Sequence, residues 1–428
     1  MNRCVDTWIG WVIVLLVSGG CASSGANRPE GPDGGDEKAT SPPKQRIEAD
    51  PMLVQVGEDG EGRTIDAGEL FDKAYRAFQN RRFERAAERY RAIVEHFPDS
   101  RYYRSALYNA GLAYEEIGRR KAASKMYRRL IDEFPDRKDT VDAFYRLADV
   151  HARRSDYRAV VELMTKVMIR DDLTTFDRIE ARVRRAEAFL EMGRLDKAET
   201  GFEKVLELNR KASAADELPE NSRFICRAYV GLGRVVHRRV GEIPLKLPPE
   251  RMGDDLKKKA ELLLDAQSFY MRALRKHHPK WSVAAGYRIG RLYEDFYSDI
   301  MAAEIPAELT DQQVEMYFDQ LRERLRPVLK RAIDVYERNL SMSRRFGETP
   351  ENNRWVAETA ESLERMKRYL RDPQTRERAQ KLARQGQDFR QLWRPFERAR
   401  DAVDRAFRRA IERAADRVGR PAERLSER

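Results

Sequence analysis

A repeat period of 37 to 38 residues runs from Leu70 to Glu207 and strongly restricts what this chain can fold into. Phe97-Pro98-Asp99 and Phe134-Pro135-Asp136 lie 37 positions apart. Within a unit, small and aromatic residues recur at helical spacing. One such series is Leu107, Ala110, Gly111 and Tyr114. A period of this length indicates stacked helical pairs rather than one globular core.

The four units resemble the tetratricopeptide repeat (TPR). In that family, helix A carries a small residue and then an aromatic, and helix B carries alanine and then an aromatic. The second unit supplies these residues as Gly111, Tyr114, Ala123 and Tyr127. The resemblance implies an all-α, right-handed superhelical solenoid of helix-turn-helix repeats. It also implies a scaffold for protein–protein interaction that is not an enzyme.

Two further units are expected after Arg210, with the same pattern spread over longer spacings. Gly233 and Ala266 lie 33 positions apart, where the compact repeat has 12 between Gly111 and Ala123. The extra residues are interpreted as insertions on one rim of the solenoid, including an extra helix from Asp311. Residues 353–370 are expected to cap the repeats, so the whole solenoid is assigned to residues 64–371.

Residues 1–20 resemble a bacterial lipoprotein signal peptide. An apolar run from Ile9 to Val17 ends in small residues before Cys21. The run is too short to span a bilayer. Ser18 departs from the leucine that the family prefers three places before the cysteine. The resemblance implies lipidation of Cys21 and a location at the outer membrane, facing the periplasm. Ordinary secretion and an uncleaved anchor are the alternatives.

Two flanking segments differ in composition from the repeats. Residues 21–63 are rich in Gly, Ser, Pro and acidic residues, which predicts a disordered tether. Residues 372–428 carry 16 Lys and Arg against 10 Asp and Glu. Their apolar residues recur at helical spacing, which predicts a charged, basic amphipathic helix. That helix either folds back on the solenoid, forms a coiled-coil stem, or contacts an anionic surface.

The binding surface is predicted by transferring the groove positions of helix A from the resembled family to this chain. The groove should accept apolar or mixed-charge segments of a partner. The alternative is that its aromatic residues only pack against the next repeat or against a docked tether. The predicted groove residues are Phe71, Tyr75, Phe78, Tyr108, Leu112, Tyr145, Asp149, Val183 and Glu187.

No motif for catalysis, a metal ion or a cofactor stands out. His277 and His278 are adjacent, so on a helix their side chains point in different directions and cannot bind one metal ion from the same face. Cys226 lies among apolar residues and is interpreted as a buried small side chain. The formal net charge of +11 is thinly spread and lacks a basic-aromatic pattern, so nucleic acid is not an expected partner.

These features favour a lipid-anchored scaffold that binds other envelope proteins or peptide segments. The first units, with their Phe-Pro-Asp endings, also look like the BamD family of outer-membrane assembly lipoproteins. A scaffold for secretion or motility fits as well. The alternatives are an envelope hydrolase or peptidoglycan-binding protein, and a cytoplasmic TPR adaptor.

Overall fold

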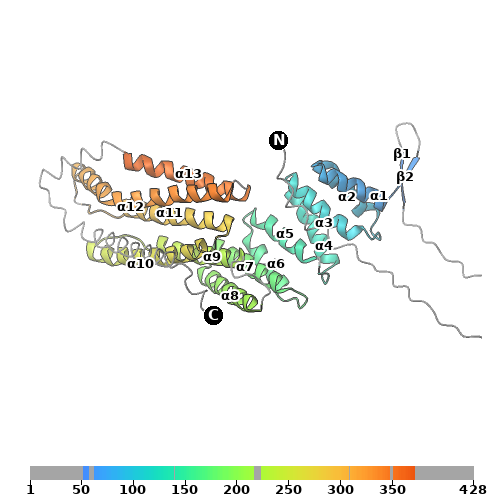
Figure 1. Ribbon diagram of the computed structural model, residues 1–428, viewed down its shortest axis with the longest axis horizontal. Helices are drawn as coiled ribbons and strands as arrows, with labels where there is room; N and C mark the ends of the chain where they lie inside the picture. The colour runs from blue at the N-terminus through green and yellow to red at the C-terminus, as the bar shows by residue number, and fades with distance from the viewer. Residues whose placement is uncertain are drawn as a thin grey trace, which may run out of the picture. The chain divides into compact units, whose positions relative to one another are not determined.

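A computed structural model describes residues 52–56, 62–138, 140–215, 223–307, 309–347 and 350–371 (Figure 1). The predicted signal peptide with Cys21 and the predicted basic tail at 372–428 lie outside the described residues, as does most of the tether. The described chain consists of helices and one short β-hairpin. None of the described helices is both long and apolar enough to cross a membrane.

The first eight helices form four consecutive helical hairpins, named units 1 to 4 here, each with a helix A and a helix B. Each helix packs against the next one along the chain. Small and aromatic residues at helical spacing therefore produce the predicted all-helical repeat fold, which is confirmed. The helices are α1 (Ala67–Gln79), α2 (Phe83–His96), α3 (Tyr103–Glu116), α4 (Arg120–Glu133), α5 (Thr140–Ala152), α6 (Tyr157–Met168), α7 (Thr175–Glu191) and α8 (Leu195–Ala214).

The turn between helix A and helix B uses one residue with positive φ in each of these units. Units 2 and 4 place Gly118 and Gly193 there, both at φ 72°. Unit 3 uses Ser155 at φ 59° and unit 1 uses Arg81 at φ 57°. A side chain costs roughly 1 kcal/mol or more in this left-handed region. The arginine in unit 1 is therefore accommodated at a cost that glycine would avoid.

A contact between a glycine of helix A and a tyrosine of helix B holds the repeated hairpins closely together. Gly111 faces the ring of Tyr127, which is completely buried. A Cβ atom on this glycine would overlap the ring. The same contact recurs between Gly233 and Tyr270 and between Gly290 and Tyr336. The small residues of the sequence pattern thus allow close helix approach, and the pattern continues beyond unit 4.

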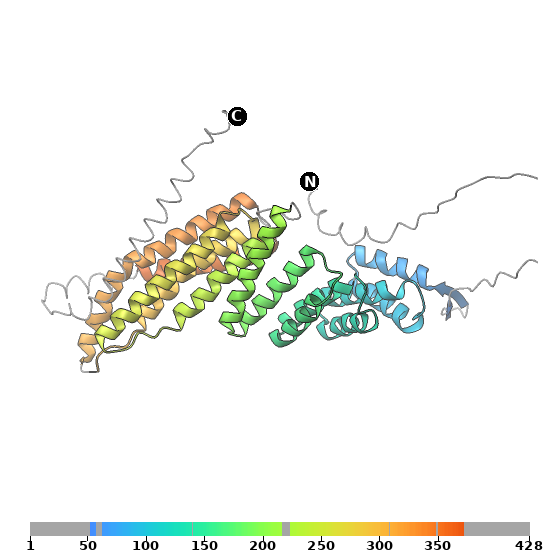
Figure 2. The same ribbon diagram turned by 90° about the horizontal axis from the view of Figure 1, so that it is seen from below.

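The later units are built from longer helices than the first ones. Most residues interpreted as rim insertions extend helices, and the extra helix expected from Asp311 is the first part of one 36-residue helix. The last helix packs on both α11 and α12, and the long helices run alongside one another (Figure 2). Helices α9 (Arg223–Gly241) and α10 (Pro249–Leu274) are helix A and helix B of unit 5. Helices α11 (Pro279–Met301) and α12 (Asp311–Phe346) are those of unit 6, and α13 (Pro350–Arg371) follows them.

A β-hairpin precedes α1, at residues where the end of a disordered tether is predicted. Strand β1 (Met52–Val56) pairs antiparallel with β2 (Gly62–Asp66), with Met52 opposite Asp66. The polar composition of the whole segment hides this short run of strand-forming residues. Asp66 also caps α1 by accepting a hydrogen bond from the amide of Glu69 at 2.7 Å. The hairpin is therefore continuous with the first repeat.

The apolar core of the described residues consists of three clusters. One joins units 1 to 3 and two alanines of α7, a second joins α7, α8 and α9, and the third joins α9 to α13. Since α7 and α9 each contribute to two clusters, burial is continuous along the repeats. This arrangement is expected when each hairpin buries its apolar faces against its neighbours.

Candidate functional site

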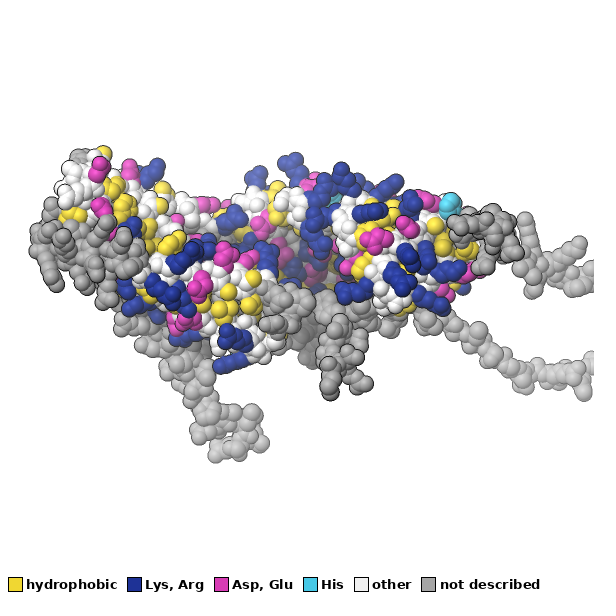
Figure 3. Space-filling model, turned by 90° about the horizontal axis from the view of Figure 1, so that it is seen from above, with side chains coloured by type: hydrophobic (Ala, Val, Ile, Leu, Met, Phe, Trp, Pro, Cys, Tyr) yellow, Lys and Arg dark blue, Asp and Glu magenta, His cyan; other side chains and the backbone are white. Residues whose placement is uncertain are grey.

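Charged and half-buried side chains cover the helix A side of the repeats. We call this surface the helix-A face. Acidic and basic side chains are intermixed over the molecule, and Figure 3 shows them meeting around a hollow in the middle of one view. The face is defined by the half-buried residues Tyr75, Tyr108, Leu112, Asp149, Arg184, Glu187 and Arg227.

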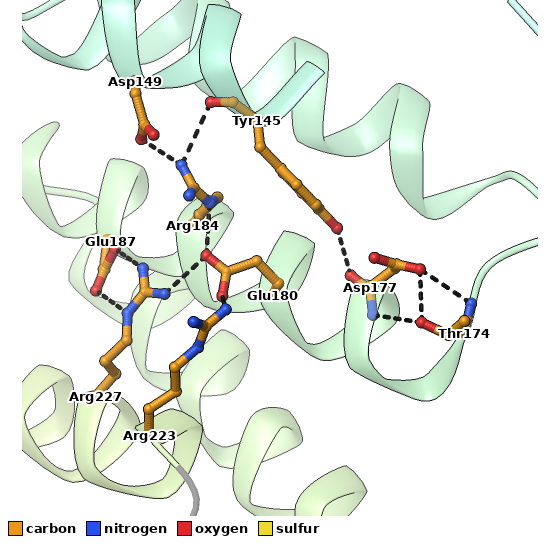
Figure 4. Close-up of polar contacts among 9 residues, drawn as sticks. All are labelled: Tyr145, Asp149, Thr174, Asp177, Glu180, Arg184, Glu187, Arg223 and Arg227. Atoms are coloured by element: carbon orange, nitrogen blue, oxygen red, sulfur yellow. Dashed lines mark hydrogen bonds and ion pairs between the residues drawn. The ribbon is translucent and has the colours of Figure 1, made fainter. Parts of the chain in front are cut away.

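A single buried carboxylate, Glu180, is the centre of the polar contacts on this face (Figure 4). Its side chain is only 3% exposed. Arg184 donates to it at 2.6 Å from the next turn of α7. From α9, Arg227 donates at 2.8 Å and Arg223 at 3.1 Å. Three guanidinium groups from two helices therefore converge on one carboxylate.

The same arginines extend the network to two further acidic residues. Arg227 holds Glu187 through both carboxylate oxygens, at 3.1 and 2.7 Å. Arg184 also donates to Asp149 on α5 and lies over the ring of Tyr145 at 5.1 Å (Figure 4). Bidentate pairing of this kind fixes geometry as well as adding energy. The network joins the A helices of units 3, 4 and 5.

The arginines control the ionisation of Glu180. Burial alone would raise the pKa of this carboxyl group, but the charges of Arg227, Arg184 and Arg223 outweigh burial and hold its pKa far below the usual value. Burial likewise disfavours the charge of Arg227, yet Glu187 and Glu180 raise its pKa above the usual value. Both groups are charged at neutral pH, so the network is a set of desolvated, mutually compensated charges.

Polar contacts between neighbouring repeats are also present on either side of this centre. Toward unit 2, Arg153 lies 3.6 Å from Glu115, which also accepts a hydrogen bond from the hydroxyl of Tyr127 at 2.7 Å. Toward unit 6, His237 on α9 lies 3.1 Å from Asp295 on α11. The A helices of units 2 to 6 are thus linked by polar contacts between neighbouring repeats.

Four of the predicted groove residues serve internal packing. Val183 is completely buried and Tyr145 is only 7% exposed, with its hydroxyl donating to the carbonyl of Asp177 at 2.9 Å. The ring of Phe71 lies between those of Tyr90 and Tyr102, at 5.4 and 5.2 Å. Phe78 makes an edge-on contact with Phe83 at 5.2 Å. Val183 therefore cannot line an open groove, and the contacts of Phe78 with Phe83 and of Phe71 with Tyr90 lie within unit 1.

The other five predicted residues lie at the helix-A face. Tyr75, Tyr108 and Leu112 are half-buried, and so are Asp149 and Glu187, which belong to the ion-pair network. The transfer of groove positions missed the arginines and the buried Glu180. Their signal was present in the sequence, since Glu180, Arg184 and Glu187 follow the i, i+4, i+7 spacing of one helix stripe.

The described residues contain no group of three or more His, Cys, Asp or Glu side chains that could hold a metal ion. Cys226 is fully buried, and burial raises the pKa of its thiol to about 11. The thiol is therefore protonated at neutral pH and behaves as a small apolar group, as interpreted from the sequence.

Comparison with known proteins identifies the repeats. Two family models described as tetratricopeptide repeat match residues 105–137 and 179–211. These matches cover helices α3–α4 and α7–α8, so the chain contains TPR units. Repeats of this kind are generally non-enzymatic scaffolds for protein–protein interaction. No curated protein sequence matches the chain.

Several solved structures share part of the helical arrangement at low similarity. A tetratricopeptide repeat protein from Parabacteroides merdae has 15% identity and a TM-score of 0.35 over 69% of this chain and 98% of its own. The apo form of RapI has 11% identity and a TM-score of 0.40 over 71% and 99%. The MamA protein has 16% identity and a TM-score of 0.35 over 49% and 91%. Similarity at this level says nothing about a shared function.

Proposed function

We propose that this protein is a lipid-anchored, non-enzymatic scaffold that binds other proteins of the bacterial envelope through its helix-A face. The observation that carries the proposal is the set of polar contacts that joins the A helices of units 2 to 6. They make one surface from residues that are distant in the chain. A partner can contact this surface at several repeats at once, which is how repeat scaffolds hold extended segments.

The chemistry of the face indicates which partner segments it fits. Its acidic and basic side chains are paired within the chain. The face therefore offers both hydrogen-bond donors and hydrogen-bond acceptors, and charges of both signs. Tyr108 and Leu112 add half-buried apolar area beside these charges. A segment with alternating charge and at least one apolar side chain would match both features.

The membrane anchor in this proposal rests on the sequence around Cys21 alone. A lipid on this cysteine would attach the chain to the outer membrane, with the repeats in the periplasm. The residues between Cys21 and the hairpin form the link to the folded repeats. Radiolabelled palmitate should enter the wild-type protein and not the Cys21→Ser variant. Equal labelling of both, with equal fractionation, would refute the anchor and favour the adaptor hypothesis.

The scaffold itself is tested by crosslinking and co-purification from cells. The Tyr75→Ala and Tyr108→Ala double variant removes half-buried side chains of the helix-A face without touching the Glu180 network. We expect it to lose the specific partners that the wild type retains. An Arg128→Ala control removes an exposed side chain from helix B of unit 2 and should retain them. Partners that survive the double variant would show that binding uses another surface.

A further inference from the structure

A pocket lined almost entirely by basic side chains lies on the first repeat. It has a volume of about 140 Å³, well above the space that one water molecule needs. Its lining contains five cations and no acidic residue. Ala77 forms its apolar part and Asn80 its one uncharged polar part. We call it the first-repeat basic pocket, and its lining is Lys73, Arg76, Ala77, Asn80, Arg82, Arg85 and Arg89.

In the part of the chain that the structure describes, most of the cations that line this pocket have no acidic partner. Elsewhere, exposed arginines commonly meet an acid one turn away, as Arg91 meets Glu95. Among the described residues, no ion pair is formed by the arginines at 76, 82 and 85. Lys73 pairs with Glu69 at 2.6 Å, which satisfies one of the five cations. The terminal repeat of a solenoid needs a polar outer surface to be soluble. That need does not explain why five cations, and no acidic residue, line one pocket.

A hydrogen bond to the backbone holds one of these cations, Arg89, in place. The guanidinium of Arg89 donates to the carbonyl of Lys73 at 2.8 Å, so the α2 side of the pocket is fixed against α1. Arg82 follows the turn residue Arg81, whose φ of 57° is the conformation that glycine supplies at Gly118 in unit 2. Unit 1 therefore keeps a further cation beside the pocket at a position where sterics favour glycine. Strained backbone of this kind is often associated with function.

We propose that the first-repeat basic pocket binds a phosphate group. Clustered arginines suit an anion with several acceptor oxygens, since each guanidinium can donate two parallel hydrogen bonds. A phosphate carries up to two negative charges and neutralises more of the pocket than a carboxylate does. The group comes from either a lipid headgroup or a soluble phosphate. The pocket uses residues that are not part of the helix-A face, so this proposal does not depend on the scaffold.

Arginine modification with a dicarbonyl reagent, read residue by residue with mass spectrometry, tests the proposal on the full chain. In the first arm, inorganic phosphate is compared with acetate at equal ionic strength. In the second, vesicles containing phosphatidic acid are compared with phosphatidylcholine vesicles. We expect at least tenfold slower modification of Arg76, Arg82 and Arg85 with the phosphate ligand in one of the two arms. Protection only by phosphatidic acid identifies a headgroup, and protection by inorganic phosphate identifies a soluble ligand.

Matched variants separate a built site from general screening of charge. The Arg82→Gln and Arg85→Gln double variant should lose the protection of Arg76. A control with Arg91→Gln and Arg128→Gln removes two exposed cations elsewhere and should keep it. Protection no greater than that of Arg128, or equal protection by acetate, would overturn the proposal. It would also be overturned if the pocket arginines were already unreactive without added anion, because the chain itself would then fill the pocket.

Discussion

The guanidinium of Arg227 on α9 reaches the carboxylate of Glu180 on α7 at 2.8 Å, although 47 positions separate the two residues in the chain. This contact joins the A helices of units 4 and 5. It is one of three arginine contacts to a side chain that is only 3% exposed. The stability of the repeats and the shape of the helix-A face therefore depend on the same charged group.

The first prediction concerns the charge of Glu180. The Glu180→Gln variant keeps the shape of the side chain but leaves three arginines without their shared anion. Breaking a buried ion pair from one side costs about 3–5 kcal/mol, so we expect a loss of this order in the free energy of unfolding. Urea-induced unfolding followed by circular dichroism measures it.

An exposed ion pair provides the control for that prediction. Glu95 pairs with Arg91 at 3.6 Å, and both side chains are about half exposed. Glu95→Gln should change the free energy of unfolding by less than about 0.5 kcal/mol. Equal effects of the two glutamine variants would mean that burial of Glu180 adds nothing to its contribution.

The second prediction concerns pH. The folded-state pKa of Glu180 lies far below the ordinary value of 4.5, because the three arginines outweigh burial. A depressed folded pKa contributes stability that is fully present above the unfolded pKa and is lost as the pH falls. The stability difference between wild type and Glu180→Gln should therefore be constant from pH 7 to about pH 5. Below pH 4.5 it should shrink by about 1.4 kcal/mol per pH unit. A difference that is the same at pH 3.5 and pH 7 would contradict this.

The third prediction compares two glycines of unit 2. Gly111→Ala adds a methyl group that would overlap atoms of the Tyr127 ring, and this ring is completely buried. We expect a loss of about 1–3 kcal/mol in the free energy of unfolding, with disturbed packing of α3 on α4. Gly118→Ala has open space around the new methyl group but keeps φ near 72°. It should cost about 1 kcal/mol through the backbone alone.

Near-ultraviolet circular dichroism distinguishes these two mechanisms. Only Gly111→Ala should alter the signal of the buried tyrosines, whereas both variants should lower the thermal midpoint. An unchanged near-ultraviolet signal in Gly111→Ala would contradict the prediction that the new methyl group disturbs the ring of Tyr127.

The helical repeats could be predicted from the sequence because their signal is local. The small residue and the aromatic that meet, such as Gly111 and Tyr127, are 16 positions apart. The same spacing separates Ala186 from Phe202, whereas unit 3 has Met164 in place of the aromatic. The later units keep a glycine–tyrosine contact of this kind, for example between Gly290 and Tyr336, although these two residues are farther apart in the sequence. The spacing alone could not show that the extra residues lengthen helices. A longer helix and a longer loop both increase the sequence distance between the small residue and the aromatic by the same amount. The β-hairpin was missed because five residues of strand pattern carry little weight in a polar segment.

The candidate site was only partly predictable. Positions transferred from a family pattern predict which side of a helix faces a groove, and two of them, Asp149 and Glu187, are half-buried residues of the ion-pair network. They do not specify which side chains the neighbouring repeat covers. Tyr145 on α5 is covered from α7, where its hydroxyl donates to the carbonyl of Asp177, 32 positions away. Val183 on α7 is buried in the cluster that α7 forms with α8 and α9. The central role of Glu180 also depends on two arginines from the next unit.

Photo-crosslinking in cells tests the central claim most directly, because it maps the bound surface residue by residue. A photoreactive amino acid is placed one position at a time at Tyr75, Tyr108 and Leu112, and at Lys125 and Arg128 on α4 as exposed controls. We expect the same partner to crosslink from at least two of the helix-A face positions and from neither control. Crosslinks of equal yield from both surfaces, or from α4 alone, would show that partners do not bind through the helix-A face.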